Sequence, residues 1–252
     1  PLGGRNFEYI SEDPYQAGKM AAAFIRGQQR TGASSSLKHF AANSQEYKRM
    51  NGDSQMDERT LREIYLTAFE TAVKEGHPGT VMCAYNKING VHCSDSKTLL
   101  TDILRTEWGF DGAVVTDWGA MHDRIKGFQA GCDLNMPGGS DYMERSAMEA
   151  VKNGKLLETD VDACVERILR LVEKARDAKP AEVDWDAHHG LAQKIAEQGA
   201  VLLKNEDGIL PLRMTDMVLI GHMAKEMRYQ GSGSSHINPT KLVSAREAMP
   251  NA

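Results

Sequence analysis

Short apolar segments alternate with longer amphipathic ones along the first half of the chain. Segments with the apolar content of buried strands lie at Leu37–Ala42, Thr80–Tyr85, Gly112–Thr116 and Cys132–Met136. Apolar residues at helical spacing predict helices over residues 17–28, 57–76, 94–108 and 120–130, and two more at about 140–153 and 158–176. Strands that alternate with helices are typical of a parallel sheet covered by helices, so the pattern predicts an α/β fold.

Polar side chains gather at the carboxyl ends of the predicted strands. Lys38-His39, Tyr85-Asn86, Asp117-Trp118 and Asn135 occupy these places on the four strands in turn. Barrels and doubly wound sheets place their chemistry at the carboxyl ends of their strands. We therefore expect the functional site at this edge of the sheet.

The composition changes around residues 178–186, where the sequence AKPAEVDWD is typical of a linker. We expect a catalytic domain over 1–177, a linker over 178–190 and the start of a second α/β domain over 191–252. In this last part the pattern predicts a helix at about 187–199 and a strand at Met217–Gly221.

The charge balance excludes some classes of partner. There are 30 basic and 35 acidic residues, a net charge of −5, and no long basic run, so nucleic acid is not expected as a partner. The apolar runs are too short to cross a bilayer, and we expect no membrane partner.

The four cysteines lack the spacing of a metal site. Free thiols in a reducing compartment are expected, with a Cys83–Cys93 disulfide as the alternative. A cytoplasmic location follows, while secretion or a periplasmic location stays open because the chain does not begin with Met.

Asp117 is a carboxylate that directly follows a buried strand, and its spacing alone favours a helix cap at Ala120 over catalysis. Asp57, Glu58 and Glu63 fit the acidic first turns of a helix. A second acidic cluster contains two histidines, and a linker with a helix cap explains it better than a metal site does; its members are Asp184, Asp186, His188 and His189.

Seven motifs in one order resemble family 3 glycoside hydrolases of the β-glucosidase type. They are GGRNFEYISEDP, KHFAAN, DERTLREIY, VMCAYNKING, WGFDGAVVTDW, AGCDLNMPGG and VLLKNEDGILPL. The resemblance implies a partial (β/α)8-type TIM barrel that lacks its first units, followed by the start of an α/β sandwich. It also implies that terminal, non-reducing β-D-glucosyl residues are released with retention through a glycosyl-Asp intermediate, without metal or cofactor.

The resemblance also implies roles for particular residues at the strand ends. Asp117 is the expected nucleophile, and Trp118 a platform for the sugar. Lys38 and His39 are expected to bind sugar hydroxyls, with non-proline cis peptides at Lys38–His39 or Phe40–Ala41.

Four more residues complete the expected sugar site. Arg5 and Arg49 match sugar-binding arginines of the family. Tyr85 is expected to donate a hydrogen bond to Asp117, and Met82 to line the pocket or to pack in the core. The acid/base glutamate is expected beyond Ala252.

Several alternatives stay open. One branch of the family acts on β-linked N-acetylglucosamine and carries a motif like KHFPGHG, but here no histidine lies between His39 and His77, which argues against that branch. A noncatalytic sugar-binding module, a subunit that needs another chain, and β-xylosidase specificity are the remaining alternatives. The expected partners are β-linked glucosides or oligosaccharides, with a homo-oligomer or a complementing chain left open.

Overall fold

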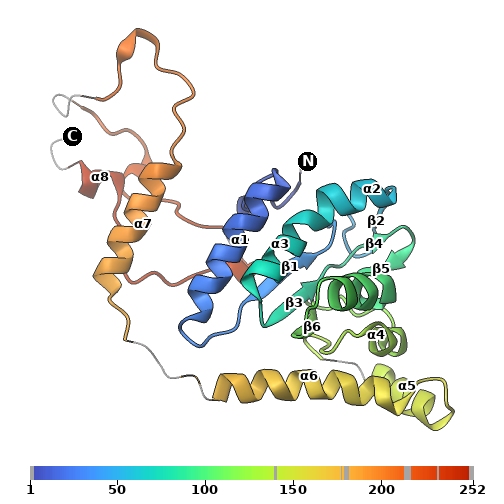
Figure 1. Cartoon of the computed structure of the whole chain (residues 1–252). Helices are drawn as coiled ribbons and strands as arrows, with labels where there is room; N and C mark the ends of the chain where they lie inside the picture. Colours follow the sequence, from blue (N-terminus) through green and yellow to red (C-terminus); the bar gives the residue numbers. More distant parts are fainter. Residues whose placement is uncertain are drawn as a thin grey trace. The chain divides into compact units, whose positions relative to one another are not determined.

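The computed structural model of the chain describes residues 3–138, 141–176, 178, 182–212, 217–231 and 233–249. The chain divides into two compact units, Pro1–Ala181 and Glu182–Ala252. The first unit is a mixed α/β structure in which helices surround a small parallel sheet (Figure 1).

Three parallel strands form this sheet: β1 (Ser36–Phe40), β3 (Thr80–Cys83) and β6 (Ala113–Thr116), in the order β1-β3-β6. In the register, Thr80 is paired with both Ser36 and Ala113. The three strands were predicted from the sequence, and their carboxyl ends lie at one edge of the sheet. The site residues are therefore brought to that edge by the direction of the strands.

The predicted fourth strand at Cys132–Met136 forms only a single parallel bridge, between Val115 and Leu134. Two of its backbone carbonyls accept hydrogen bonds from the Arg124 guanidinium instead of from a neighbouring strand; they are those of Cys132 (3.0 Å) and Asp133 (3.3 Å). Pro137 then ends the segment, since proline has no N–H to continue a ladder.

Helix α1 (Pro14–Gln29) is capped by Asp13, whose side chain accepts hydrogen bonds from two backbone N–H groups of the first turn. It packs against α3 (Thr67–Gly76), which continues from α2 (Glu58–Thr60) through the π-helical segment Leu61–Leu66 (Figure 1). The two helices approach so closely that a Cβ at Gly18 would lie 2.7 Å from the Cβ of Thr71.

The described part of this unit also contains the π-helical segment Thr98–Glu107 and the helices α4 (Arg124–Ala130), α5 (Asp141–Lys152) and α6 (Glu158–Arg176). Two short 3₁₀ helices lie at Asn6–Glu8 and Cys93–Asp95. Helix α4 begins later than the predicted residue 120, because the Asp123 side chain accepts from the backbone N–H groups of residues 125 and 126 and fixes the start there.

The core lies between the sheet and the helices that cover it. Phe40 is fully buried at the end of β1, and its ring makes edge contacts with Phe69 and Trp108 at centroid distances of 5.1 and 5.8 Å. All four cysteines are buried and free, so the alternative Cys83–Cys93 disulfide is not formed.

A second, small sheet was not predicted. It contains β2 (Asp53–Ser54), β4 (Lys87–Ile88) and β5 (Val91–His92) in the order β2-β4-β5. The hairpin turns at Asn89-Gly90, where both residues have positive φ, as such turns require. Strands of two residues are too short to give a period in the sequence, which is why this sheet escaped detection.

The described part of the second unit contains the helices α7 (Trp185–Gly199) and α8 (Ala245–Ala248) and short 3₁₀ helices at Glu206–Gly208, His222–Ala224 and Gly233–Ser235. Helix α7 begins inside the range 178–190 that was expected to be a linker. The predicted strand at Met217–Gly221 is wrong. Val218 and Ile220 are 80% and 90% exposed there, and no strand in the described part of this unit lies beside them to complete a sheet.

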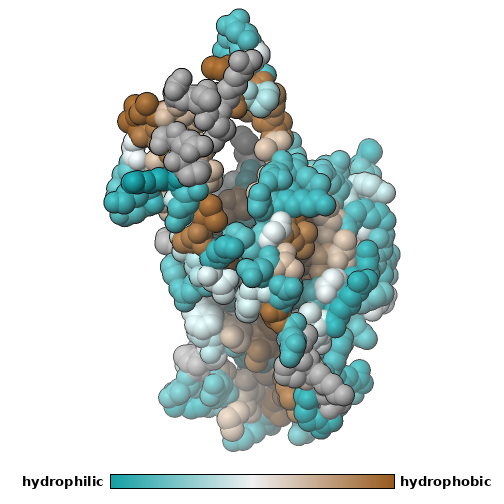
Figure 2. Space-filling model, turned by 90° about the vertical axis from the view of Figure 1, so that its left-hand side faces the viewer, coloured by the Kyte–Doolittle hydropathy of each residue, from teal (hydrophilic) through white to brown (hydrophobic). Residues whose placement is uncertain are grey.

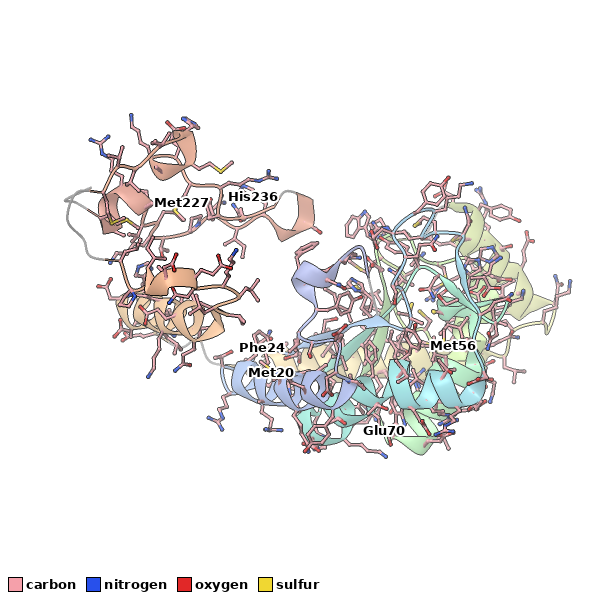
Figure 3. The ribbon with its side chains drawn as sticks, turned by 90° about the horizontal axis from the view of Figure 1, so that it is seen from above. Met20, Phe24, Met56, Glu70, Met227 and His236 are labelled. Atoms are coloured by element: carbon pink, nitrogen blue, oxygen red, sulfur yellow. The ribbon has the colours of Figure 1, made fainter. Side chains whose placement is uncertain are left out.

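Apolar side chains also reach the surface of the first unit. Met20 and Phe24 lie one turn apart on α1 and are exposed (Figure 3). Figure 2 shows such apolar side chains lying between hydrophilic ones on one face of the molecule. Within the described residues, no helix combines the length and the apolar character needed to cross a membrane.

Asp133 ties three elements of the first unit together. Its fully buried carboxylate accepts hydrogen bonds from the guanidinium groups of Arg105 (2.8 Å) and Arg167 (2.7 Å), and from the backbone N–H of Val114 (2.6 Å) in β6. Burial lowers the pKa of Arg105, and the charge of Asp133 opposes this effect. The carboxylate thus joins the sheet to the helix at 98–107 and to α6.

Replacing Asp133 by Ala is expected to lower the free energy of unfolding by about 3–5 kcal/mol, because two half-buried cations lose their partner. Urea denaturation followed by tryptophan fluorescence measures this change. Asp102→Asn is the matched control, since the ion pair between Asp102 and Lys97 is exposed and contributes little. Equal unfolding midpoints for the two variants would contradict the role given to Asp133.

Candidate active site

Asp117 lies immediately after β6, at the carboxyl edge of the sheet. Its backbone N–H donates to the carbonyl of Cys83 (3.0 Å) at the end of β3, and its Oδ1 accepts from the backbone N–H of Trp118 (2.6 Å). The side chain is 14% exposed. Helix α4 starts at Arg124 with Asp123 as its cap, so Asp117 does not have the helix-capping role that its spacing favoured.

His39 faces Asp117 from β1, on the other side of β3. Its ring is 1% exposed, and its Nε2 lies 3.5 Å from Asp117 Oδ2. Burial, followed by the positive charges of Arg5 and Lys38, lowers the pKa of His39 to about 4, although the charge of Asp117 acts in the opposite direction. The imidazole is therefore neutral at neutral pH.

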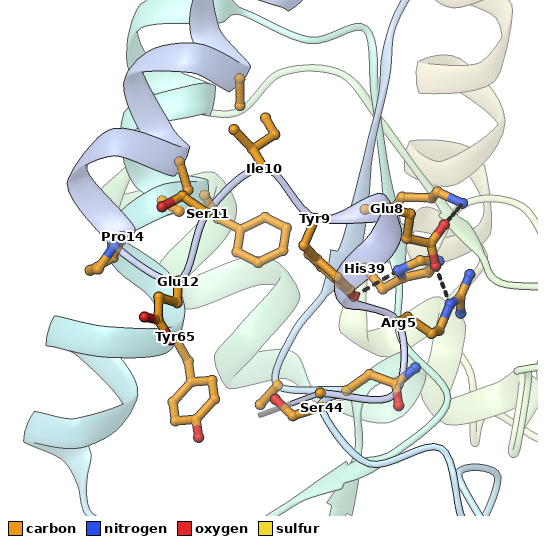
Figure 4. A pocket seen from close by; sticks show the side chains of 18 of the residues that line it. Arg5, Glu8, Tyr9, Ile10, Ser11, Glu12, Pro14, His39, Ser44 and Tyr65 are labelled. Atoms are coloured by element: carbon orange, nitrogen blue, oxygen red, sulfur yellow. Dashed lines mark hydrogen bonds and ion pairs between the residues drawn. The ribbon is translucent and has the colours of Figure 1, made fainter. Parts of the chain in front are cut away.

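Glu8 holds two of the expected sugar-binding cations. Its carboxylate forms an ion pair with the Arg5 guanidinium, and its Oε2 lies 3.4 Å from Lys38 Nζ (Figure 4). Burial alone would raise the pKa of Glu8, but the hydrogen bond from Arg5 and the charge of Lys38 outweigh burial, so the pKa is lowered. Glu8 is thus a charged anchor between two cations at neutral pH.

Tyr85 follows β3 and lies close to the nucleophile candidate. Its hydroxyl donates a hydrogen bond to the backbone carbonyl of Trp118 (2.8 Å). The sequence had led us to expect this hydroxyl to donate to the Asp117 side chain. Burial raises the pKa of Tyr85, and the charge of Asp117 adds to the effect. Arg49 stacks on the Tyr85 ring, with its guanidinium carbon 4.6 Å from the ring centroid.

The last two expected residues differ in their surroundings. Trp118 is 64% exposed, so its ring is free to take part in stacking. Met82 is half-buried in β3, paired in register with Val115. Arg49 is also held by an ion pair with Glu46 (3.0 Å).

A cavity of about 450 Å³ borders part of the site (Figure 4). It is lined by the segment that carries Arg5 and Glu8, by α1 and α3, and by Lys38 and His39 of β1. Asp117 is not among its lining residues. The cluster of polar contacts around Asp117, rather than the cavity volume, therefore defines the candidate active site.

The sequence reasoning missed Glu8 and Tyr9. Tyr9 Oη lies 2.9 Å from His39 Nδ1 (Figure 4). Both residues belong to the quoted motif GGRNFEY, so the signal was present, but no spacing rule connects them to partners about thirty residues away. The peptide bonds Lys38–His39 and Phe40–Ala41 are both cis, as the resemblance implied.

The other acidic candidates have structural partners. Asp57 caps α2, Glu58 pairs with Arg62, and Glu63 pairs with Arg59. Asp184 caps α7 by accepting from the backbone N–H of residue 187 (2.9 Å). The described residues contain no group of three or more histidine, cysteine or acidic side chains arranged to hold a metal ion.

The chain is similar to proteins of one known family. Residues 1–171 match the model described as the glycosyl hydrolase family 3 N terminal domain, and residues 200–252 match the family 3 C-terminal domain. The thermostable β-glucosidase B of Acetivibrio thermocellus is 52% identical over all of this chain, which corresponds to 34% of that protein.

Two further relatives differ in what their names say. An exo-α-(1→6)-L-arabinopyranosidase of Bifidobacterium longum is 46% identical, over 97% of this chain and 34% of its own length. The structure of β-glucosidase 3B from Thermotoga neapolitana in complex with α-D-glucose is 41% identical, with a TM-score of 0.91 over 99% of this chain and 36% of that chain.

This chain spans about a third of the length of the curated relatives that it matches. The match to the family's N-terminal domain nevertheless covers more than half of the chain, and the match to its C-terminal domain follows in the same order. The chain therefore belongs to glycosyl hydrolase family 3.

Proposed function

We propose that this chain carries the nucleophile of a retaining β-glucosidase, which releases terminal non-reducing β-D-glucosyl residues from β-glucosides or cello-oligosaccharides. The observation that carries the proposal is the Asp117 carboxylate at the carboxyl end of β6, with the buried imidazole of His39 facing it. The names of the relatives support the substrate class, and the family match supports glycoside hydrolysis.

In the proposed reaction an Asp117 oxygen attacks the anomeric carbon of the sugar. A bond forms between that oxygen and the carbon, while the bond from the carbon to the glycosidic oxygen breaks, and the leaving group takes a proton from a second carboxyl group. Water then attacks the glycosyl-Asp intermediate, and the second carboxylate accepts its proton. The configuration is retained because the carbon is inverted twice.

The second carboxyl group must lie about 5–5.5 Å from the nucleophile in a retaining enzyme. The acidic residues considered above are engaged in caps and ion pairs, and none was assigned this role from the sequence. We propose that the acid/base is a glutamate supplied from outside residues 1–252. We also propose that the sheet β1-β3-β6 is part of a (β/α)8-type TIM barrel and that the second unit is the start of an α/β sandwich.

The surrounding donors suit the binding of sugar hydroxyls. Arg5 and Lys38 are held by Glu8, and Arg49 by Glu46 and the Tyr85 ring. Charged donors fixed in this way lose little entropy on binding and make strong hydrogen bonds to hydroxyls. The exposed Trp118 ring offers a flat face for the sugar or the leaving group.

A panel of substrates tests the specificity of the proposed enzyme within the family. The relative named as an exo-α-(1→6)-L-arabinopyranosidase is 46% identical, so aryl β-glucoside, β-xyloside and α-L-arabinopyranoside substrates belong in one assay panel. Activity confined to the β-xyloside or the arabinopyranoside would contradict the glucosidase proposal. Sugar binding without turnover by the gene product would favour the noncatalytic alternative. A cytoplasmic location, and a homo-oligomer or complementing chain, stay predictions.

Asp117→Ala in the gene product that contains this chain is expected to lower kcat for an aryl β-glucoside by roughly 10⁴-fold or more, the scale seen when an enzyme loses its nucleophile. Azide should restore turnover and give the glucosyl azide of inverted configuration. Asp111→Ala is the matched control, since Asp111 is exposed just before the same strand, and near-normal rates are expected. Near-normal turnover by Asp117→Ala would refute the assignment.

Glu8→Gln is expected to raise KM for the glucoside about tenfold with a smaller change in kcat, because Arg5 and Lys38 lose the charge that holds them for binding. Steady-state kinetics measures both constants. Glu75→Gln, which removes the carboxylate of an exposed pair with Lys19, should change neither. An unchanged KM in Glu8→Gln would show that the two cations do not bind the sugar through this anchor.

A further inference from the structure

Tyr9 has a contact that the proposed reaction does not use directly. It follows the short helix Asn6–Glu8, and its hydroxyl lies 2.9 Å from His39 Nδ1 (Figure 4). Burial raises the pKa of Tyr9, so the hydroxyl keeps its proton at neutral pH. It is therefore able to act as a hydrogen-bond donor.

His39 stands between Tyr9 and Asp117, with one ring nitrogen toward each. Nδ1 faces the Tyr9 hydroxyl, and Nε2 lies 3.5 Å from Asp117 Oδ2. A neutral imidazole carries one N–H donor and one bare acceptor nitrogen, and its neighbours decide which nitrogen holds the proton.

The carboxylate favours a proton on the ring nitrogen that faces it, because an ionised carboxylate only accepts hydrogen bonds. Asp117 Oδ2 is buried and has no hydrogen-bond partner among the described residues, and the Nε2 of His39 lies 3.5 Å from it. A proton on Nδ1 instead would turn the lone pair of Nε2 toward this oxygen and leave the buried oxygen facing like charge density.

We propose that Tyr9 is a positioning residue that donates to His39 Nδ1 and so keeps the proton of His39 on Nε2, facing Asp117 Oδ2. The inference rests on the proposed role of Asp117 as the nucleophile. It adds a residue that touches neither the sugar nor the reacting carboxylate, and that acts through the imidazole between them.

The hydrogen bond from His39 would help to fix the plane of the Asp117 carboxylate. Oδ1 is fixed by the backbone N–H of Trp118 (2.6 Å), while Oδ2 is approached by His39 from another element. Two donors from different elements restrain the rotation of the carboxylate, and a nucleophile that is held before the substrate arrives reacts faster than one that must be ordered in the transition state.

The test is the tautomer of His39 in the gene product labelled with ¹⁵N-histidine, measured by the long-range ¹H–¹⁵N correlations of the ring and assigned by comparison with His39→Gln. The native protein is expected to carry the proton on Nε2. In Tyr9→Phe the donor is lost while the ring volume is kept, and the proton should move at least partly to Nδ1. The same variant should lose three- to tenfold in kcat for an aryl β-glucoside, the range expected for one hydrogen bond, with KM within about twofold.

Tyr15→Phe is the matched control, since Tyr15 is 66% exposed on α1, and it should change neither the spectrum nor kcat. A proton on Nδ1 in the native protein, or an unchanged tautomer in Tyr9→Phe, would overturn the proposal. The spectrum of the native protein alone shows which nitrogen of His39 carries the proton. Absence of β-glucosidase activity would overturn the proposed function alone, because the tautomer is measured without turnover.

Discussion

The shared direction of β1, β3 and β6 is the constraint on which the site depends. Parallel strands in register end at one edge, so His39, Tyr85 and Asp117, which lie far apart in the sequence, meet there. Asp133 links the sheet to the helices, because its carboxylate accepts hydrogen bonds from the β6 backbone and from two arginines of other elements. A rigid strand end holds the Asp117 carboxylate in one position, which the proposed reaction requires.

Charge is distributed unevenly over this edge, and the distribution suits the proposed chemistry. Glu8 pairs with Arg5 and Lys38 on one side, while the buried His39 stays neutral next to Asp117 because burial opposes its protonation. A protonated imidazole there would form a tight ion pair with Asp117 and weaken the attack that we propose for this carboxylate. A neutral imidazole with its proton on Nε2 supports the carboxylate without neutralising it.

The sequence predicted the parts of the fold that follow from periodicity. The three strands of the sheet, α1, the helix around 57–76 and the residues at the strand ends were foreseen from apolar spacing. The two-residue strands β2, β4 and β5 were missed because they are too short for a period. The strand predicted at Met217–Gly221 failed because apolar content alone does not supply a neighbouring strand. The contacts of Glu8 and Tyr9 needed the structure, since they join segments thirty residues apart.

Trapping the glycosyl-enzyme tests the proposed role of Asp117 most directly. A 2-deoxy-2-fluoro-β-glucoside with a good leaving group forms the covalent intermediate and slows its hydrolysis, because the fluorine destabilises the oxocarbenium-like transition state. If Asp117 is the nucleophile, the gene product gains the mass of one fluoroglucosyl group, and peptide mapping places this group on Asp117. A label on another carboxylate, or inactivation without a covalent adduct, would contradict the assignment of Asp117 as the nucleophile.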